Sequence, residues 1–144
     1  MNGEQIGRYL HKYYKHLFIG VFASDELPTS ITCPSILVCN TDASNLPGEH
    51  WISIFIDVNG CGEFFDSFGR EPGDPFVNFM NRNCMLWTFN DKQLQNILSS
   101  FCGHYCIFYS IHRSRGMNMI AITKLFSDNT NLNDYLVHKF VCRK

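Results

Sequence analysis

The stretch Ser99-Ser100-Phe101-Cys102-Gly103-His104-Tyr105-Cys106 predicts the start of a buried helix, and the rest of the fold can be placed around it. From Cys102 onward nothing breaks the helix until Arg113-Ser114-Arg115-Gly116, where cations followed by glycine are typical of a helix end. The serines before Cys102 are residue types that cap helices, which puts Cys102 in the first turn. Unpaired backbone N–H groups and the helix dipole favour a thiolate there. Cys102 is therefore a candidate nucleophile, although a helix with two unreactive core cysteines fits the same stretch.

The middle of the chain predicts strands, with helices before and after them. Residues 50–57 are apolar on both faces, and a strand of that kind lies at the centre of a sheet. Further strands are expected at 18–22, 35–40, 63–68 and 84–89. Helices are expected at 4–17, 75–81, from Cys102 onward, 119–126 and 131–141. This order indicates an α+β fold in which helices flank a mixed or antiparallel central sheet.

Composition describes one globular domain over residues 1–144. Apolar residues make up 45% of the chain, so a packed core is expected. The formal net charge is −1, so the chain has no strong overall positive charge that would attract nucleic acid. A solvated helix face explains the basic residues near the two ends, which are Arg8, Lys12, Lys15, Lys139, Arg143 and Lys144. Because no apolar run is long enough to cross a bilayer, we expect no membrane partner.

The seven cysteines indicate a reducing environment rather than a disulfide framework. Their number is odd, and the stretch Met1-Asn2-Gly3-Glu4-Gln5 lacks the basic flank and apolar run of a secretory signal. We therefore expect an intracellular protein that is not secreted. No metal site is predicted, because the closest cysteine pair, Cys102 and Cys106, lacks the second pair that structural zinc sites usually have.

Three polar residues near strand ends complete a candidate site for Cys102. His50 opens the central strand, Asp66 closes the next one, and Gln95 lies seven residues before Cys102. A thiolate mechanism needs an imidazole that protonates the leaving amine, a carboxylate that orients the imidazole, and an amide that donates to the oxyanion. Gly103 leaves space beside the sulfur, where we expect a substrate backbone to approach. Taken singly, these residues also fit a strand end, a turn and a surface amide.

The hairpin between residues 57 and 61 decides whether His50 and Asp66 can meet. A two-residue loop, Asn59-Gly60, would place Asp66 on the sheet face away from His50. A three-residue loop, Val58-Asn59-Gly60 with Gly60 left-handed, would place Asp66 on the His50 face, diagonal to it. The chemistry therefore requires the longer loop, and the sequence permits it.

These residues together carry a family resemblance. The motifs are Gly48-Glu49-His50-Trp51, Phe65-Asp66-Ser67-Phe68-Gly69, Gln95 and Cys102-Gly103. In this order and spacing they resemble the adenain family, the adenovirus-type cysteine endopeptidases, which is related to the SUMO-deconjugating proteases. The resemblance covers roughly residues 18–116. Adenovirus members often carry glutamate at the position of Asp66, whereas the SUMO proteases share the aspartate.

The resemblance implies an adenain-like cysteine protease fold and a role for each residue. Cys102 would be the nucleophile at the N-terminus of the buried helix, His50 the general base and acid, Asp66 the orienting acid and Gln95 the oxyanion donor. It also implies an endopeptidase that cuts polypeptides near small residues such as glycine. Such an enzyme would mature the structural proteins of a virus or virus-like mobile element, in the host nucleus or cytoplasm or in the virion.

Two other functions stay open at this point. One is an isopeptidase that removes a ubiquitin-like modifier, since the same four residues serve that reaction. The other is an inactive binding module of the same fold. An intact set of four residues argues against the inactive module, but the loops that select a substrate cannot be interpreted from the sequence.

Cofactors are expected from the resemblance alone, because the chemistry itself requires none. Cys84 lies where adenovirus proteases bond an activating peptide through a disulfide, and DNA is a second cofactor of that family. The resemblance thus implies an activating peptide and weak nucleic-acid binding for an otherwise monomeric enzyme. Arg82 beside Cys84 would lower the thiol pKa and favour exchange. The alternative is that Cys84 is a thiol without a partner.

Overall fold

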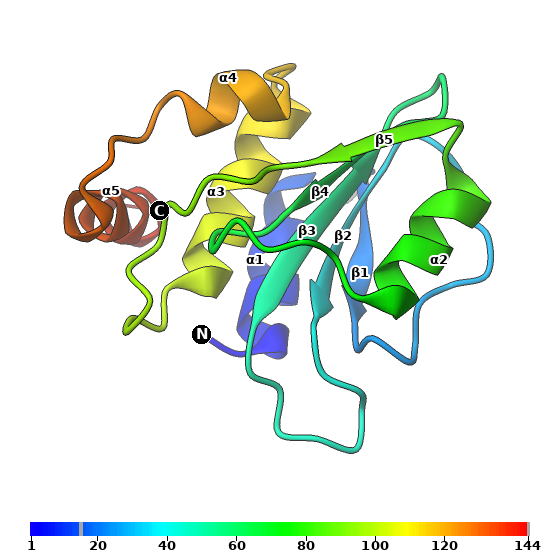
Figure 1. The fold of residues 1–144 in the computed structure, drawn as a ribbon, viewed down its shortest axis with the longest axis horizontal. Coiled ribbons are helices and arrows are strands. Elements are labelled where there is room, and N and C mark those ends of the chain that lie inside the picture. The colour runs from blue at the N-terminus through cyan, green and yellow to red at the C-terminus, as the bar shows by residue number, and fades with distance from the viewer. Residues whose placement is uncertain (15, 144) are drawn as a thin grey trace.

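The computed structural model describes residues 1–14 and 16–143, so the basic positions Lys15 and Lys144 lie outside the described residues. Five strands form one sheet in the order β1-β2-β3-β4-β5. They are β1 (Phe18–Phe22), β2 (Ser35–Asn40), β3 (Trp51–Ile56), β4 (Cys61–Phe65) and β5 (Leu86–Phe89). The two edge strands run parallel to their neighbours and the inner pairs are antiparallel. The sheet is therefore mixed, with β3 at its centre, which confirms the predicted α+β class (Figure 1).

Helices cover both faces of this sheet. They are α1 (Gly3–Tyr14), α2 (Asp74–Asn83), α3 (Cys102–Ser114), α4 (Met119–Thr123) and α5 (Thr130–Cys142). In Figure 1, α2 lies on one face, α1 and α3 lie on the other, and α5 packs outside α3. Within the described part of the chain, no helix combines the length and apolar character needed to cross a membrane.

The two faces of β3 enter two separate hydrophobic cores, as its sequence predicts. Ile52, Ile54 and Ile56 are fully buried in the core beneath α2. Phe55 faces the other core, which α1, α3 and α5 cover, and half-buried Trp51 packs against it. A central strand with apolar side chains on both faces is held from both sides, so its N-terminal end is a rigid place for a functional residue.

Several predicted strand boundaries differ from the structure. β3 begins at Trp51, one residue after His50, and β4 begins at Cys61, two residues earlier than predicted. Two further differences have clear local reasons. β4 ends at Phe65 rather than residue 68, because the Asp66 carboxylate accepts the N–H of Phe68 and turns the chain. β5 begins at Leu86 rather than residue 84, because the N–H of Cys84 bonds to the Met80 carbonyl and completes α2. α1 and α4 also end three residues earlier than predicted, at Tyr14 and Thr123.

The β3–β4 hairpin has the longer of the two expected loops. Ser53 lies opposite Phe65 and Ile56 opposite Gly62, so the register places Asp57 opposite Cys61 and leaves residues 58–60 as the loop. Gly60 has a φ of +81°, the left-handed conformation that this loop requires. The register therefore carries Asp66 to the same sheet face as His50.

A partly buried ion pair connects the α3 helix to the sheet. Glu63 of β4 lies 3.1 Å from the guanidinium of Arg113 in α3, and each side chain is 15% exposed. The same carboxylate accepts the Tyr109 hydroxyl at 2.6 Å and the N–H of Met119 at 3.0 Å. The Arg113 guanidinium also stacks over the Phe55 ring. Glu63 thus joins β4, α3 and the start of α4.

We predict that Glu63→Ala destabilises the protein by about 3 kcal/mol, because it removes the counter-charge of the mostly buried Arg113 and the acceptor of the Tyr109 hydroxyl and the Met119 N–H. Chemical denaturation measures the free energy of unfolding. Glu4→Ala is the matched control, since it removes the exposed ion pair to Arg8 and should cost less than about 0.5 kcal/mol. Equal stability of Glu63→Ala and Glu4→Ala would contradict the structural role of Glu63.

Candidate active site

Four predicted residues converge where β3 begins and α3 begins. His50, Gln95 and Cys102 line a pocket of about 200 Å³, together with Trp51, Phe68 and other residues. Asp66 lies behind His50, and all four predicted residues are less than 9% exposed. The fold therefore brings together residues that the sequence places in three separate segments.

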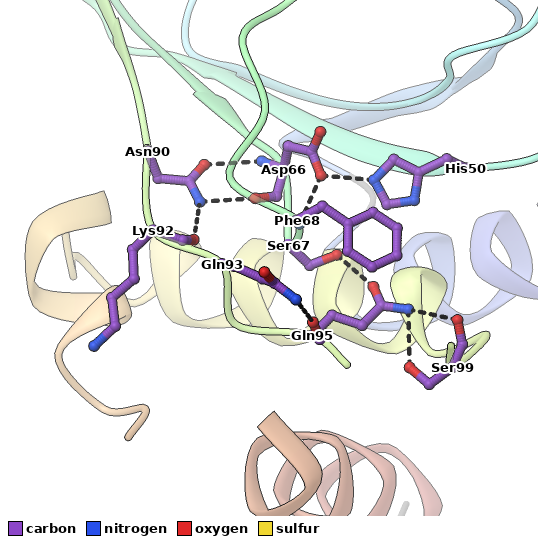
Figure 2. A network of polar contacts seen from close by, with 9 residues as sticks. All are labelled: His50, Asp66, Ser67, Phe68, Asn90, Lys92, Gln93, Gln95 and Ser99. Carbon is purple, nitrogen blue, oxygen red and sulfur yellow. Dashed lines mark hydrogen bonds and ion pairs between the residues drawn. The ribbon is translucent and has the colours of Figure 1, made fainter. Parts of the chain in front are cut away.

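His50 is held between a carboxylate and an aromatic ring (Figure 2). Its Nε2 lies 2.6 Å from Asp66 Oδ1, which also accepts the N–H of Phe68 at 2.8 Å. The Phe68 ring stacks on the imidazole with the centroids 4.6 Å apart, and the Arg70 guanidinium covers Phe68. Because Asp66 uses Nε2, Nδ1 is the nitrogen left for Cys102.

The electrostatics of His50 and Cys102 favour an ion pair. Burial lowers the pKa of His50, but its hydrogen bonds to Asp66 and Cys102 outweigh burial and raise the pKa to about 9. Burial raises the pKa of Cys102, but His50 and the backbone N–H groups of Trp51 and Gly103 lower the pKa below its ordinary value. The pair can therefore exist as thiolate and imidazolium near neutral pH.

Cys102 is the first residue of α3, and no side chain caps this helix. Its N-cap is Phe101, so the expectation that the preceding serines cap the helix is wrong. The N–H groups of the first turn are consequently not used by a cap, and that of Gly103 faces the sulfur. Cys106, one turn further on, behaves differently, because complete burial raises its pKa. The alternative interpretation, in which both cysteines are unreactive core residues, therefore fits Cys106 and not Cys102.

Gly103 makes room for α1 rather than for a substrate. A Cβ atom built at Gly103 would lie 3.1 Å from the Ile6 side chain and 3.2 Å from Met1. These distances are tighter than ordinary van der Waals contact, so a larger residue would push α1 away from α3. The predicted open approach beside the sulfur is thus occupied by the N-terminal segment of the chain.

Gln95 lies in the pocket, but its amide is fully engaged (Figure 2). Its Oε1 accepts the Ser67 hydroxyl at 2.6 Å. Its Nε2 donates to the carbonyl and the hydroxyl of Ser99, both at 3.1 Å. The acceptor end of the amide is thereby fixed, and the donor end is the one that can be turned toward a ligand. Donation to an oxyanion stays a prediction, which requires Nε2 to leave Ser99.

Sequence reasoning missed the polar residues that hold this site, namely Ser67, Asn90 and Ser99. Asn90 follows the last residue of β5, and its amide bonds to the backbone of Asp66. The signal that identified His50 and Asp66, a polar residue at a strand end, also applies to Asn90. Ser67 and Ser99 carry no such signal, because their role depends on the path of the loop around Gln95.

Cys84 lies in a different element than predicted, and its thiol pKa is shifted in the opposite direction. It caps the C-terminus of α2 instead of lying in β5, and it is half-buried. Burial, together with the thiols of Cys33 and Cys61, raises its pKa to about 11. The expected lowering by Arg82 is therefore wrong; the Arg82 guanidinium lies near the Phe79 ring. A disulfide of Cys84 to a peptide stays a prediction.

Among the described residues, no three metal-binding side chains lie close enough to hold an ion.

Known proteins with similar sequences are viral cysteine proteases. No protein-family model matches the chain. A cysteine protease of African swine fever virus from a Malawi tick isolate is 33% identical over 115 residues, which are 72% of this chain and 40% of the relative. The protein of a Kenyan pig isolate, named a SUMO-1 cysteine protease, is 32% identical over 115 residues with the same coverage. The chain thus spans 40% of the length of these relatives.

The fold matches a solved structure of the same kind. The crystal structure of the African swine fever virus pS273R protease aligns with a TM-score of 0.70 over 93% of this chain and 64% of that chain. The sequence identity in this alignment is 18%, so the match shows the fold alone. The chain therefore has the fold of a viral cysteine protease and is similar in sequence to proteins of that class.

We predict that Cys102 reacts with iodoacetamide at a lower pH than an ordinary thiol. The rate of alkylation follows the thiolate fraction, so its midpoint should lie below about pH 8.5. In His50→Ala the midpoint should rise relative to wild type, because burial is then opposed by the backbone N–H groups of Trp51 and Gly103 without the imidazole. Peptide mapping of the alkylated protein over a pH series measures both midpoints. A wild-type midpoint equal to that of exposed Cys61 would contradict the ion pair.

Proposed function

We propose that the chain is a cysteine protease in which Cys102 attacks the carbonyl carbon of a peptide bond. The observation that carries the proposal is the buried His50–Asp66 contact of 2.6 Å beside a cysteine at an uncapped helix N-terminus. This arrangement lowers the pKa of the thiol and raises that of the imidazole, as nucleophilic catalysis by cysteine requires. Similarity to viral proteins named cysteine proteases supports it independently.

The residues then divide the reaction among them. The Cys102 thiolate adds to the carbonyl carbon, and the oxyanion that forms accepts the backbone N–H at the start of α3 and the Gln95 amide once it leaves Ser99. The His50 imidazolium gives its proton to the departing amine, which leaves a thioester on Cys102. Neutral His50 next takes a proton from water, and the hydroxide adds to the thioester. Collapse of this intermediate releases the acid and restores the thiolate.

The size of the pocket favours small residues at the scissile bond. A volume of about 200 Å³, bordered by Trp51 and Phe68, is below the roughly 300–1,000 Å³ usual for ligand pockets, so a narrow segment of small residues fits it better than a bulky one. Cleavage near glycine or another small residue is therefore the preferred substrate class. We infer an endopeptidase of the adenain type that processes structural proteins of a virus or mobile element, in the infected cell or in the virion.

A second candidate is removal of a ubiquitin-like modifier. The observation that favours this candidate is that one of the viral relatives is named a SUMO-1 cysteine protease. The chemistry at Cys102 would be unchanged, and the difference would lie in whether a folded modifier or an extended chain is recognised.

We predict that the protein hydrolyses short glycine-containing peptides and has little activity on fusions to a ubiquitin-like modifier. Release of a fluorescent amine and gel analysis of the fusions measure the two activities. Cys102→Ala should abolish hydrolysis, and His50→Ala should lower kcat/KM at least about 100-fold. Gln95→Ala should have a smaller effect than His50→Ala, because the backbone donor remains.

Faster cleavage of the fusions than of the peptides would establish the isopeptidase instead. Hydrolysis that survives Cys102→Ala would refute the mechanism. A protein that folds and cleaves neither substrate would support the inactive binding module.

A cofactor peptide of the kind that the family resemblance implies would have to form a disulfide with Cys84. Because the raised pKa of Cys84 leaves little thiolate at neutral pH, we predict slow disulfide exchange there. Activation by a cysteine peptide should therefore be as strong in Cys84→Ala as in wild type, under oxidising as well as reducing conditions. Peptidase assays under reducing and oxidising conditions test this. Loss of activation in Cys84→Ala only under oxidising conditions would instead establish the disulfide.

A further inference from the structure

Asn90 holds the backbone of Asp66 with both ends of its side-chain amide (Figure 2). The N–H of Asp66 donates to Asn90 Oδ1 at 2.9 Å, and Asn90 Nδ2 donates to the carbonyl of Asp66 at 2.7 Å. Asn90 Nδ2 also reaches the Lys92 carbonyl at 3.4 Å. The asparagine is 7% exposed and Asp66 is 4% exposed, so these contacts are shielded from water.

The position of these contacts gives them a particular consequence. The last backbone pair between β4 and β5 joins Phe64 to Phe89, and the last pair between β3 and β4 joins Ser53 to Phe65. Asp66 therefore lies just beyond both ladders, where strand pairing no longer fixes its backbone. The Asn90 amide accepts the Asp66 N–H and donates to the Asp66 carbonyl, which the N–H of Gly69 also reaches at 2.8 Å. Asn90 thereby extends the hydrogen-bond ladder of the sheet by one residue.

We propose that Asn90 is a positioning residue that places the Asp66 carboxylate against His50 and thereby sets the orientation of His50 toward Cys102. The proposal rests on the proposed function, since it concerns the same catalytic group. The carboxylate itself is bonded to His50 and to the N–H of Phe68, so a shift of the Asp66 backbone is transmitted directly to the imidazole.

The charges around His50 allow this geometric role to be separated from an electrostatic one. The titratable and charged groups near His50 are Asp66 after β4, Cys102 on α3, Glu49 and the N-terminal residue Met1 at the pocket, and Arg70 over the stacked Phe68 ring. Cys106 interacts with Cys102 and Asp66 from within α3. Asn90 carries no charge. Its replacement by a small neutral residue therefore leaves every charge in place and changes only how firmly Asp66 is held.

The test is the pH dependence of Cys102 alkylation by iodoacetamide, which needs no knowledge of the substrate. In Asn90→Ala the midpoint of this profile should rise by about one pH unit, because a loosened His50–Asp66 contact stabilises the ion pair less. Hydrolysis of the glycine peptides should fall with it. Asn90→Ser is a milder change, and its side chain cannot make both contacts to Asp66. It should shift the midpoint in the same direction, and it provides the test if Asn90→Ala does not fold.

Two controls separate positioning from a general loss of stability. Asn133→Ala removes another buried asparagine, one that bonds to the carbonyls of Leu94 and Ser127 and not to Asp66. It should lower stability without moving the midpoint. Ser67→Ala removes the hydrogen bond that fixes Gln95 Oε1 and should reduce peptide hydrolysis, again with the wild-type midpoint.

The outcomes are distinct. A folded Asn90 variant with the wild-type midpoint would overturn the proposal and leave Asn90 a structural residue. An equal shift in Asn133→Ala would overturn it as well, since the effect would then follow stability. A wild-type protein whose Cys102 has an ordinary midpoint would instead refute the proposed function, independently of any Asn90 variant.

Discussion

The hydrogen bond between His50 Nε2 and Asp66 Oδ1 is the interaction on which the candidate site depends. It joins residues sixteen positions apart at a distance of 2.6 Å, with both side chains almost completely buried. Only the hairpin register with a three-residue loop brings them to one face, and Gly60 makes that loop possible by adopting a positive φ. A one-residue change in register would move Asp66 to the opposite face and remove the partner that raises the pKa of His50.

The remaining structure keeps that bond aligned with Cys102. α3 carries the cysteine, and the Glu63–Arg113 ion pair attaches this helix to the strand that leads to Asp66. The two sides of the site are thus fixed to one another through β4. Gly103 lets α1 pack closely against the first turn of α3, which holds the helix N-terminus from its other side. Catalytic geometry of this kind requires rigid support, because a displacement of about 1 Å can cost about 100-fold in rate.

The oxyanion side of the site is arranged differently from the nucleophile side. The Cys102 thiol already has its partners, whereas the N–H groups of Gln95 are bonded to Ser99. Ser67 fixes the acceptor end of the amide, so the donor end is the part that a substrate can recruit by displacing Ser99. Such an exchange replaces one set of hydrogen bonds with another, and it therefore costs little when a carbonyl oxygen enters the pocket.

The sequence by itself determined the local features: a cysteine at a helix start, polar residues at strand ends, and a central strand apolar on both faces. These follow from periodicity and residue type, which act over a few positions. Tertiary structure decided which hairpin loop forms, that Gly103 faces α1, that Gln95 is held by Ser67 and Ser99, and that the pKa of Cys84 is raised. Asn90 could have been noticed as a strand-end residue, but its bond to Asp66 depends on the pairing of β4 with β5. Contacts between distant segments depend on how layers pack, and no local pattern specifies the partner that a buried polar group will meet.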